Sequence, residues 1–157
     1  DKLANIPHVK RIRIHTRIPT VLPSRITESF INKIRGQQSE IVIVTHINHP
    51  NELDEETDKV LRKLRQAGLA LLNQTVLLNA VNDKTKILVE LSEKLFNQGV
   101  LPYYLHLSDK VEGTQHLCVT TNTARQLFRD MLKELPGYLV PRLVVEEPGK
   151  SSKTLIV

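Results

Sequence analysis

The sequence repeats one unit, in which a short run of β-branched and aliphatic residues is followed by polar turn residues and then by a segment with the hydrophobic period of a helix. Five strands are predicted in this way, at about residues 9–14, 40–47, 69–72, 101–107 and 139–145. Four helices are predicted between them, at about residues 28–35, 54–67, 84–97 and 123–134. Strands and helices in this order predict right-handed βαβ units and a parallel sheet. The fold class is therefore α/β, either an open doubly wound sheet or an arc of a (β/α) barrel.

The length and composition are those of one globular domain. A chain of 157 residues can bury one real core, and a hydrophobic fraction of 40% with a charged fraction of 25% is typical of a soluble protein. No apolar run approaches the roughly 20 residues that span a bilayer, and no signal peptide is visible, so no membrane partner is expected. Cys118 is the only cysteine, which rules out an internal disulfide and favours a reducing, cytoplasmic location.

The charge balance favours anionic partners. The net charge is +5 and the isoelectric point is near 9.4, which suits phosphorylated cofactors. Nucleic acid is not expected, because the basic residues are scattered apart from Lys10–Arg13 and Arg62–Arg65, and aromatic residues make up only 4% of the chain. We interpret those two basic runs as solvated faces of a strand and a helix.

Polar residues of the kinds that do chemistry gather just after the predicted strand ends. They are Thr16, Arg17, His46, Asn48, His49, Asn73, Gln74, His106, Asp109, His116 and residues 146–153. The carboxyl ends of parallel strands lie on one rim of a β/α fold, so these residues are expected to converge on one site. No Gly-x-Gly-x-x-Gly follows a strand and no Walker-type loop is present, so neither kind of nucleotide site is expected.

Two chemistries fit these rim residues. The histidines and Asp109 are ligand types for zinc or iron, but they show none of the usual spacings, and hydrogen bonding to backbone or substrate is the alternative. Asp109 and Glu146 come from the ends of two neighbouring strands. Paired carboxylates do acid–base work or clamp a cation such as an ammonium group. Two solvated loop acids are the alternative interpretation of this pair.

The C-terminal segment runs from an apolar strand into a polar turn that carries Lys150 and Lys153. A lysine at a strand end can form a Schiff base with an aldehyde cofactor such as pyridoxal phosphate, and an amine substrate can then exchange with it. A solvated surface turn is the alternative interpretation of the same residues.

Five motifs resemble, in the same order, the strand-end motifs of the lysine 2,3-aminomutase family. They are Arg13–Thr27 (RIHTRIPTVLPSRIT), Thr45–Leu53 (THINHPNEL), Asn73–Asp83, Leu101–His116 and Gly137–Lys153. The match covers nearly the whole chain. The resemblance implies a radical S-adenosylmethionine enzyme that also uses pyridoxal phosphate, built on an incomplete TIM-type (β/α) barrel.

The resemblance implies roles for three rim residues. Lys153 matches the lysine that binds pyridoxal phosphate, and Asp109 and Glu146 match the two carboxylates that hold the side-chain ammonium of the substrate lysine. The turn here is Pro-Gly-Lys-Ser-Ser-Lys, where the family has a run of glycines. Lys150 therefore competes with Lys153 for the cofactor, although the spacing favours Lys153.

This chain contains only some of the residues with which the family binds its other cofactors. Gln74 and His46 match positions that contact S-adenosylmethionine, and His106 lies where some relatives have an aromatic hydroxyl near the cofactor. The family's cluster motif, Cys-x3-Cys-x2-Cys, is missing from this sequence. Residues 1–157 are therefore expected to be the C-terminal portion of the enzyme, with no metal ligand of their own. The ligands of the [4Fe-4S] cluster would lie outside, so the isolated chain is predicted to be inactive.

The implied reaction converts L-α-lysine to (R)-β-lysine. A radical derived from S-adenosylmethionine would remove a β-hydrogen, and the amino group would migrate from C2 to C3. Leu101–His106 resembles the short bacterial branch whose product is attached to elongation factor P, which would make that factor and its ligase indirect partners. An exposed sheet edge is expected to promote homo-oligomers. The alternatives are a non-catalytic, partner-binding β/α fragment and a metal-dependent hydrolase.

Overall fold

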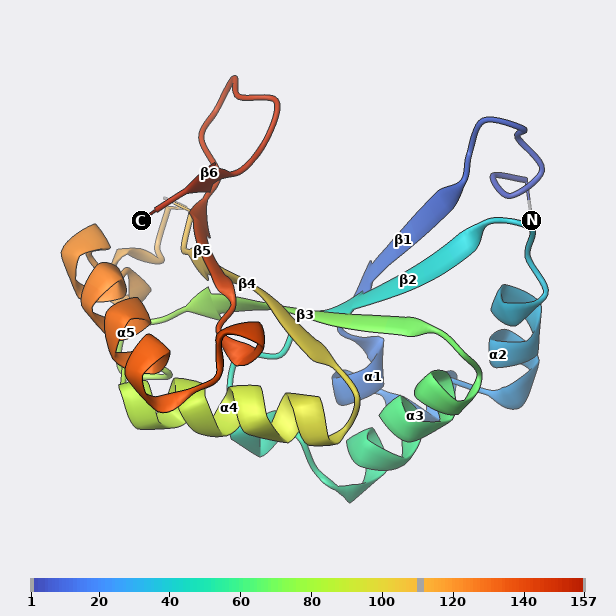
Figure 1. Cartoon of the computed structure of the whole chain (residues 1–157), viewed down its shortest axis with the longest axis horizontal. Helices are drawn as coiled ribbons and strands as arrows, with labels where there is room; N and C mark the ends of the chain where they lie inside the picture. Colours follow the sequence, from blue (N-terminus) through green and yellow to red (C-terminus); the bar gives the residue numbers. More distant parts are fainter. Residues whose placement is uncertain (1, 110–111, 157) are drawn as a thin grey trace.

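In the computed structural model, which describes residues 2–109 and 112–156, the chain forms one curved sheet with helices along its convex side (Figure 1). The strands lie in chain order: β1 Arg11–Thr16, β2 Glu40–Thr45, β3 Ala70–Leu77, β4 Leu101–Leu107, β5 Arg142–Val145 and β6 Thr154–Leu155. The helices are α1 Ile18–Val21, α2 Glu28–Arg35, α3 Glu55–Gln66, α4 Thr85–Asn97 and α5 Thr121–Glu134. Strands β1 to β5 are parallel, which confirms the α/β class and the parallel sheet. Strands β1 and β6 are the edges of the sheet, which is not closed within the described residues.

The structure differs from the sequence prediction in the extent of two strands and in two additional short elements. Strand β3 continues to Leu77, although its polar residues after 72 predicted a loop. Strand β5 begins only at Arg142, because residues 137–139 form a single 3-10 turn and Pro141 has no N–H for a ladder bond. Two short elements were not predicted: α1, which has a proline in its first turn, and β6, which pairs antiparallel with β5.

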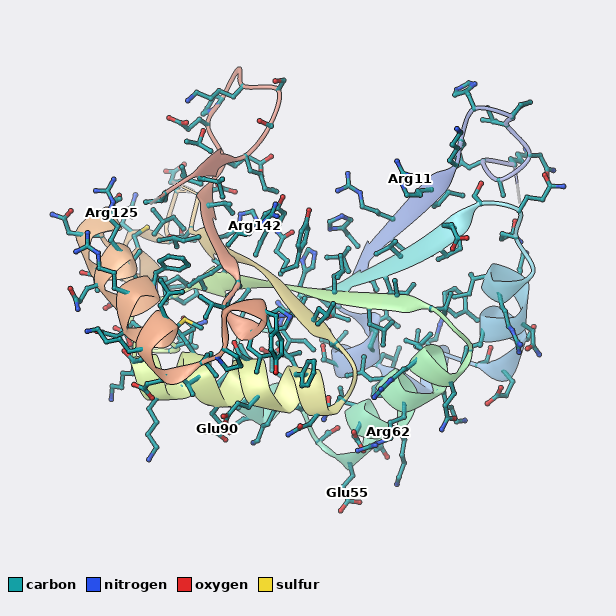
Figure 2. All side chains as sticks on the ribbon, viewed as in Figure 1. Arg11, Glu55, Arg62, Glu90, Arg125 and Arg142 are labelled. Carbon is teal, nitrogen blue, oxygen red and sulfur yellow. The ribbon has the colours of Figure 1, made fainter. Side chains whose placement is uncertain are left out.

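Strand β1 shows how the sequence separates the two faces of the sheet. Ile12 and Ile14 pack against the core formed with the helices. Successive side chains on a strand point to opposite faces, so Arg11, Arg13 and His15 lie on the concave face. Figure 2 shows Arg11 on this side of the ribbon. Figure 2 also shows Arg142 there, on the opposite arm. Strand β1 therefore presents charged and polar groups to the concave face and aliphatic groups to the core on the convex face.

The core consists of two aliphatic clusters between the sheet and the helices. The first includes Ile31 of α2, Leu61 and Leu64 of α3, and Leu71 of β3. The second includes Leu88, Leu105, Leu127, Met131 and Leu143, from α4, β4, α5 and β5. Burial of such side chains is worth about 1.5–3 kcal/mol each relative to exposure, so these clusters hold the helices to the convex face. Among the described residues, no helix is both long and apolar enough to cross a bilayer.

A buried asparagine fixes the end of β2 against β3. Asn73 is 1% exposed, and its side-chain oxygen accepts from the Thr45 hydroxyl at 2.8 Å and from the Ile47 N–H at 2.9 Å. Its amide donates to the Ile47 carbonyl and to the Thr75 hydroxyl, both at 2.9 Å. Buried polar groups are costly unless they are paired, and here all of these bonds are made. The network therefore holds the segment after β2, and with it His46, in one position.

Candidate active site

A cavity with a volume of about 1220 Å³ lies at the carboxyl ends of β4 and β5 and along the concave face. Its walls come from the loops after these two strands and from β1 across the sheet. The predicted site residues Asp109, Glu146 and Lys153 all line it, as does Lys150. The structure therefore brings the lysines and the paired carboxylates to one cavity on one side of the sheet.

The pairing of β5 with β6 decides which lysine meets which carboxylate. Val145 faces Thr154 across the two antiparallel strands, so the next residues outward, Glu146 and Lys153, lie opposite each other. The Lys153 ammonium donates to a Glu146 carboxylate oxygen at 2.9 Å. This hydrogen bond and the positive charge of Lys153 lower the pKa of Glu146. The Lys153 ammonium also lies 5.8 Å from the centre of the Tyr104 ring, within the range of a cation–π contact.

Lys150 has a different environment from Lys153. Its ammonium pairs with Glu147 at 2.7 Å, and Glu147 also accepts from the Thr154 hydroxyl. The Lys150 side chain is 55% exposed, whereas that of Lys153 is 25% exposed. The two lysines thus form two separate ion pairs around one hairpin loop, and Lys153 is the less exposed of the two.

Asp109 follows β4 and is exposed at the cavity wall. Among the described residues it has no ion-pair partner, in contrast to Glu146. The cavity is thus lined by two carboxylates that bind lysine ammonium groups, Glu146 and Glu147, and by Asp109, which has no such partner among the described residues.

Three histidines lie along the concave side near the strand ends: His15 of β1, His46 directly after β2, and His106 of β4. The Nδ1 of His15 lies 3.4 Å from the Nε2 of His46. Burial lowers the pKa of both rings, and for His46 the His15 ring and then the positive charge of Arg17 add to this effect. His106 is 5% exposed, and its Nε2 has no hydrogen-bond partner among the described residues. His46 and His106 were predicted from the sequence as site residues. His15 was not predicted, and its only signal was its place in the alternation of β1.

Gln74 lies on β3, opposite Tyr104 of β4 in the strand register. It is half-buried, and the described part of the structure gives its amide no hydrogen-bond partner. Gln74 therefore offers a donor and an acceptor beside the histidines and Tyr104.

His49 and His116 were the other histidines considered as metal ligands, and each of them lies at a 3-10 turn. His49 caps the 3-10 turn Pro50–Glu52, where its Nδ1 accepts from the Asn51 N–H at 3.1 Å. His116 lies in a separate 3-10 turn, and its backbone carbonyl accepts from Asn79 at 3.0 Å. No group of three or more metal-binding side chains occurs in the part of the chain that is described. This geometry gives the metal-dependent hydrolase alternative no support.

Several known proteins resemble this chain in sequence or in fold. No family model matches the sequence. The chain is 49% identical over 153 residues to the L-lysine 2,3-aminomutase of Escherichia coli strain K12, an alignment that covers 98% of this chain and 45% of that protein. The chain is a homologue of the L-lysine 2,3-aminomutases. Related enzymes of Methanococcus maripaludis and Clostridium subterminale are 39% and 38% identical, with 98% and 99% of this chain aligned to 35% and 37% of theirs. The aminomutase resemblance predicted from the motifs is thereby confirmed.

The chain spans less than half the length of these aminomutases, and the matched region is a C-terminal part of them. Solved structures agree on the fold. A radical SAM methyltransferase from Sphaerobacter thermophilus superposes with a TM-score of 0.61 at 14% identity, covering 88% of this chain and 40% of that one. Streptococcus suis SuiB bound to S-adenosylmethionine superposes with a TM-score of 0.60 at 13% identity, covering 86% and 32%. At such identities these likenesses show a shared fold and nothing more.

His106 is expected to make stability depend on pH. Its pKa is lowered from 6.5 to about 4, first by burial and then by the positive charge of Lys153. Between these two values the unfolded chain binds a proton that the folded chain does not. Stability is therefore expected to be greatest above pH 6.5 and to fall by up to about 3 kcal/mol as the pH approaches 4.

Urea unfolding at a series of pH values checks this expectation. His106→Gln should flatten the curve between pH 6.5 and 4, whereas the same change at the exposed His8 should leave its slope as in the wild type. An unchanged slope in His106→Gln would show that another group controls the effect.

Proposed function

We propose that this chain is part of an enzyme that converts L-α-lysine to (R)-β-lysine by radical migration of the amino group from C2 to C3. The observation that carries the proposal is the shared cavity: Lys153, Glu146 and Asp109 line one space at the carboxyl ends of the strands. The homology to L-lysine 2,3-aminomutases supports the same reaction.

Asp109 and Glu146 are proposed to hold the side-chain ammonium of the substrate. Glu146 binds the primary ammonium of Lys153 at 2.9 Å, which is the same chemical group at the end of the same kind of alkyl chain. Charge-assisted hydrogen bonds of this kind are roughly twice as strong as neutral ones. Two carboxylates at this position select a diamino acid and reject an acidic one, whose carboxylate they would repel.

Lys153 is proposed to bind pyridoxal phosphate. The residues present fit that cofactor, because a lysine amine lies at the wall of a cavity of about 1220 Å³ that is also lined by Arg13, a cation suited to a phosphate. When bound, the cofactor supplies an aldehyde that condenses reversibly with amines and a conjugated ring that delocalises an unpaired electron. Glu146 holds the amine of Lys153 at the cavity wall through their 2.9 Å ion pair.

S-adenosylmethionine is proposed to bind beside Gln74, His46 and His106. The unpaired Nε2 of His106 supports this placement, because a buried polar atom without a partner is where a ligand atom fits. A cluster does not fit this chain, since Cys118 is its only cysteine and clusters take several thiolates. We therefore infer that residues 1–157 are the C-terminal portion of the enzyme, and that this portion alone is inactive.

The fate of the product is proposed from the motif Leu101–His106. Its resemblance to the short bacterial branch supports a role in supplying (R)-β-lysine for modification of elongation factor P by its ligase, in the cytoplasm. The unpaired outer edge of β1 supports self-association.

The proposed function is tested with the complete protein that contains this chain, reconstituted with iron, sulfide, pyridoxal phosphate and S-adenosylmethionine. Lysine labelled at its α-amino nitrogen should give β-lysine with the label at C3. The 157-residue chain under the same conditions should give none. Absence of labelled β-lysine from the reconstituted protein would contradict the proposal and favour a non-catalytic module. Product from the isolated chain would contradict the requirement for residues outside it.

A further inference from the structure

The ring of His46 has one polar partner among the described residues, and that partner is His15. The Nδ1 of His15 lies 3.4 Å from the Nε2 of His46, and the two rings meet edge to face with their centres 5.6 Å apart. His15 also lines the cavity that contains Lys153. One residue therefore contacts both that cavity and His46, and the proposed function does not yet use it.

The sheet holds the two histidines at matching positions. Strands β1 and β2 pair in parallel with His15 opposite Val44, and His46 follows Val44 by two residues (Figure 1). Side chains two residues apart on an extended chain lie on the same face, so both rings lie on the concave face. Beyond the strands, Arg17 forms an ion pair with Glu52 at 3.2 Å, which joins the segment after β1 to the segment after β2. The approach of His15 to His46 is therefore fixed from both directions along the chain.

The backbone on either side of His46 is also fixed. The Thr45 hydroxyl and both backbone groups of Ile47 are hydrogen-bonded to the buried Asn73. These bonds hold the backbone but leave the side-chain torsions of His46 to other contacts. In the described part of the chain, the only hydrogen-bonding contact of the ring is the one with His15. His15 is thus the residue that can select one orientation of this ring.

The same contact determines where the proton of each ring lies. Burial is the largest cause that lowers the pKa of both histidines, so both rings are neutral at pH 7.5. A neutral imidazole has one nitrogen that donates and one that accepts. In a hydrogen bond between two neutral rings one nitrogen donates and the other accepts, so each ring is confined to one tautomer. The second nitrogen of His46, Nδ1, then has a defined role toward a ligand.

His46 lies close to a buried atom that lacks a partner. His106 is 5% exposed, and its Nε2 makes no hydrogen bond to any described residue. Burial is the main cause that lowers the pKa of His106, and the nearby Lys153 and His46 contribute to the same direction. A ligand that bonds to the Nε2 of His106 therefore meets the ring of His46 in the orientation that His15 gives it.

We propose that His15 is a positioning residue for S-adenosylmethionine, because it holds the ring of His46 in the orientation and the tautomer in which that ring meets the bound molecule. The inference rests on the proposed function, in which S-adenosylmethionine binds beside Gln74, His46 and His106. His15 acts through His46 and does not itself need to touch the ligand.

The test uses the complete protein that contains this chain and two substitutions of His15. His15→Leu keeps a side chain of similar size and removes the hydrogen bond. His15→Asn places an amide, which can donate or accept, near the position of the Nδ1 atom. His8→Leu is the matched control, since His8 is exposed and precedes β1. His15 is exposed as well, so all three changes are expected to preserve the fold.

Nitrogen NMR of protein labelled only in its histidines reports the tautomer of His46, whose signals are identified by their loss in His46→Gln. In the wild type, one ring nitrogen should carry the proton and the other should not. In His15→Leu the two tautomers should mix, and the two nitrogen signals should approach each other. His15→Asn and His8→Leu should each keep a single tautomer. A residue that only supports the fold would not change this pattern.

Calorimetric titration of the reconstituted protein gives the affinity for S-adenosylmethionine. His15→Leu should bind it about fivefold more weakly or worse, whereas His15→Asn and His8→Leu should stay within about twofold of the wild type. If His15→Leu keeps the wild-type affinity, or if its His46 signals are unchanged, the inference is wrong even when the enzyme makes β-lysine. Equal losses of affinity in His15→Leu and His15→Asn would also overturn it, because they would show that the hydrogen bond to His46 is not what matters.

These measurements separate the inference from the proposed function. Neither of them requires lysine, pyridoxal phosphate or turnover. If the wild-type protein forms no β-lysine, but His15→Leu mixes the tautomers of His46 and weakens the binding of S-adenosylmethionine, the proposed reaction fails and the role of His15 stands.

Discussion

Lys153→Ala is expected to abolish the covalent attachment of pyridoxal phosphate and to lower kcat/KM for lysine by about 10³-fold or more, since the amine that condenses with the cofactor is removed. Borohydride reduction of the loaded protein, followed by peptide mapping, should find the cofactor on Lys153 in the wild type and nowhere in this variant. Lys150→Ala is the matched control from the same hairpin loop. It should keep the adduct, because Lys150 is 55% exposed and paired with Glu147 instead.

A second substitution separates the reaction of Lys153 from its ion pair. Lys153→Arg keeps a positive charge beside Glu146, and thereby the contact that joins β5 to β6, but a guanidinium does not condense with the aldehyde. This variant should fold with wild-type stability and lack the adduct. An adduct that persists in Lys153→Arg and disappears in Lys150→Ala would assign the cofactor to Lys150.

Asp109→Asn and Glu146→Gln are each expected to lower kcat/KM for lysine by about 10²–10³-fold, because each change removes a negative charge that would bind the substrate ammonium. The same changes should affect norleucine, which lacks the terminal amine, far less. Competition of the two amino acids for the loaded protein measures this difference directly. The adduct with pyridoxal phosphate should persist in both variants, since Lys153 is intact.

Glu147→Gln is the matched control for these two carboxylates. Glu147 lines the same cavity and follows Glu146 directly, but it pairs with Lys150 and accepts from Thr154. Its substitution should leave the preference for lysine over norleucine within about twofold of the wild type. Equal losses in Glu146→Gln and Glu147→Gln would show that the net charge of the loop matters and not a specific clamp.

It was predictable that the site residues would lie close together, because a parallel β/α sheet places the carboxyl ends of all its strands on one rim. Asp109, Glu146 and Lys153 follow two strands, and the structure gathers them around one cavity. His15 was missed, because alternation along β1 places it on the concave face but its contact with His46 depends on the pairing of β1 with β2. The roles of the site residues remain predictions, which the substitutions above test.

For some strands, the local sequence pattern predicted the wrong length. Asn73, Gln74 and Thr75 predicted a loop after a short third strand, yet they belong to β3. Asn73 is tolerated there because its side chain bonds to the backbone of residue 47 and to two threonines. A sequence shows that Asn73 is polar, but two of its partners, Thr45 and Ile47, lie more than 25 positions away and become visible only in the fold.

The sequence by itself determined the α/β class, the order of strands and helices, and the rim on which chemistry would gather, because these depend on local hydrophobic period and on the handedness of βαβ units. Only the tertiary structure decided which groups meet. The antiparallel register of β5 with β6 pairs Lys153 with Glu146, and the parallel register of β1 with β2 brings His15 to His46. Both depend on hydrogen bonds between strands, and a shift of one residue in register would send each of these side chains to the opposite face.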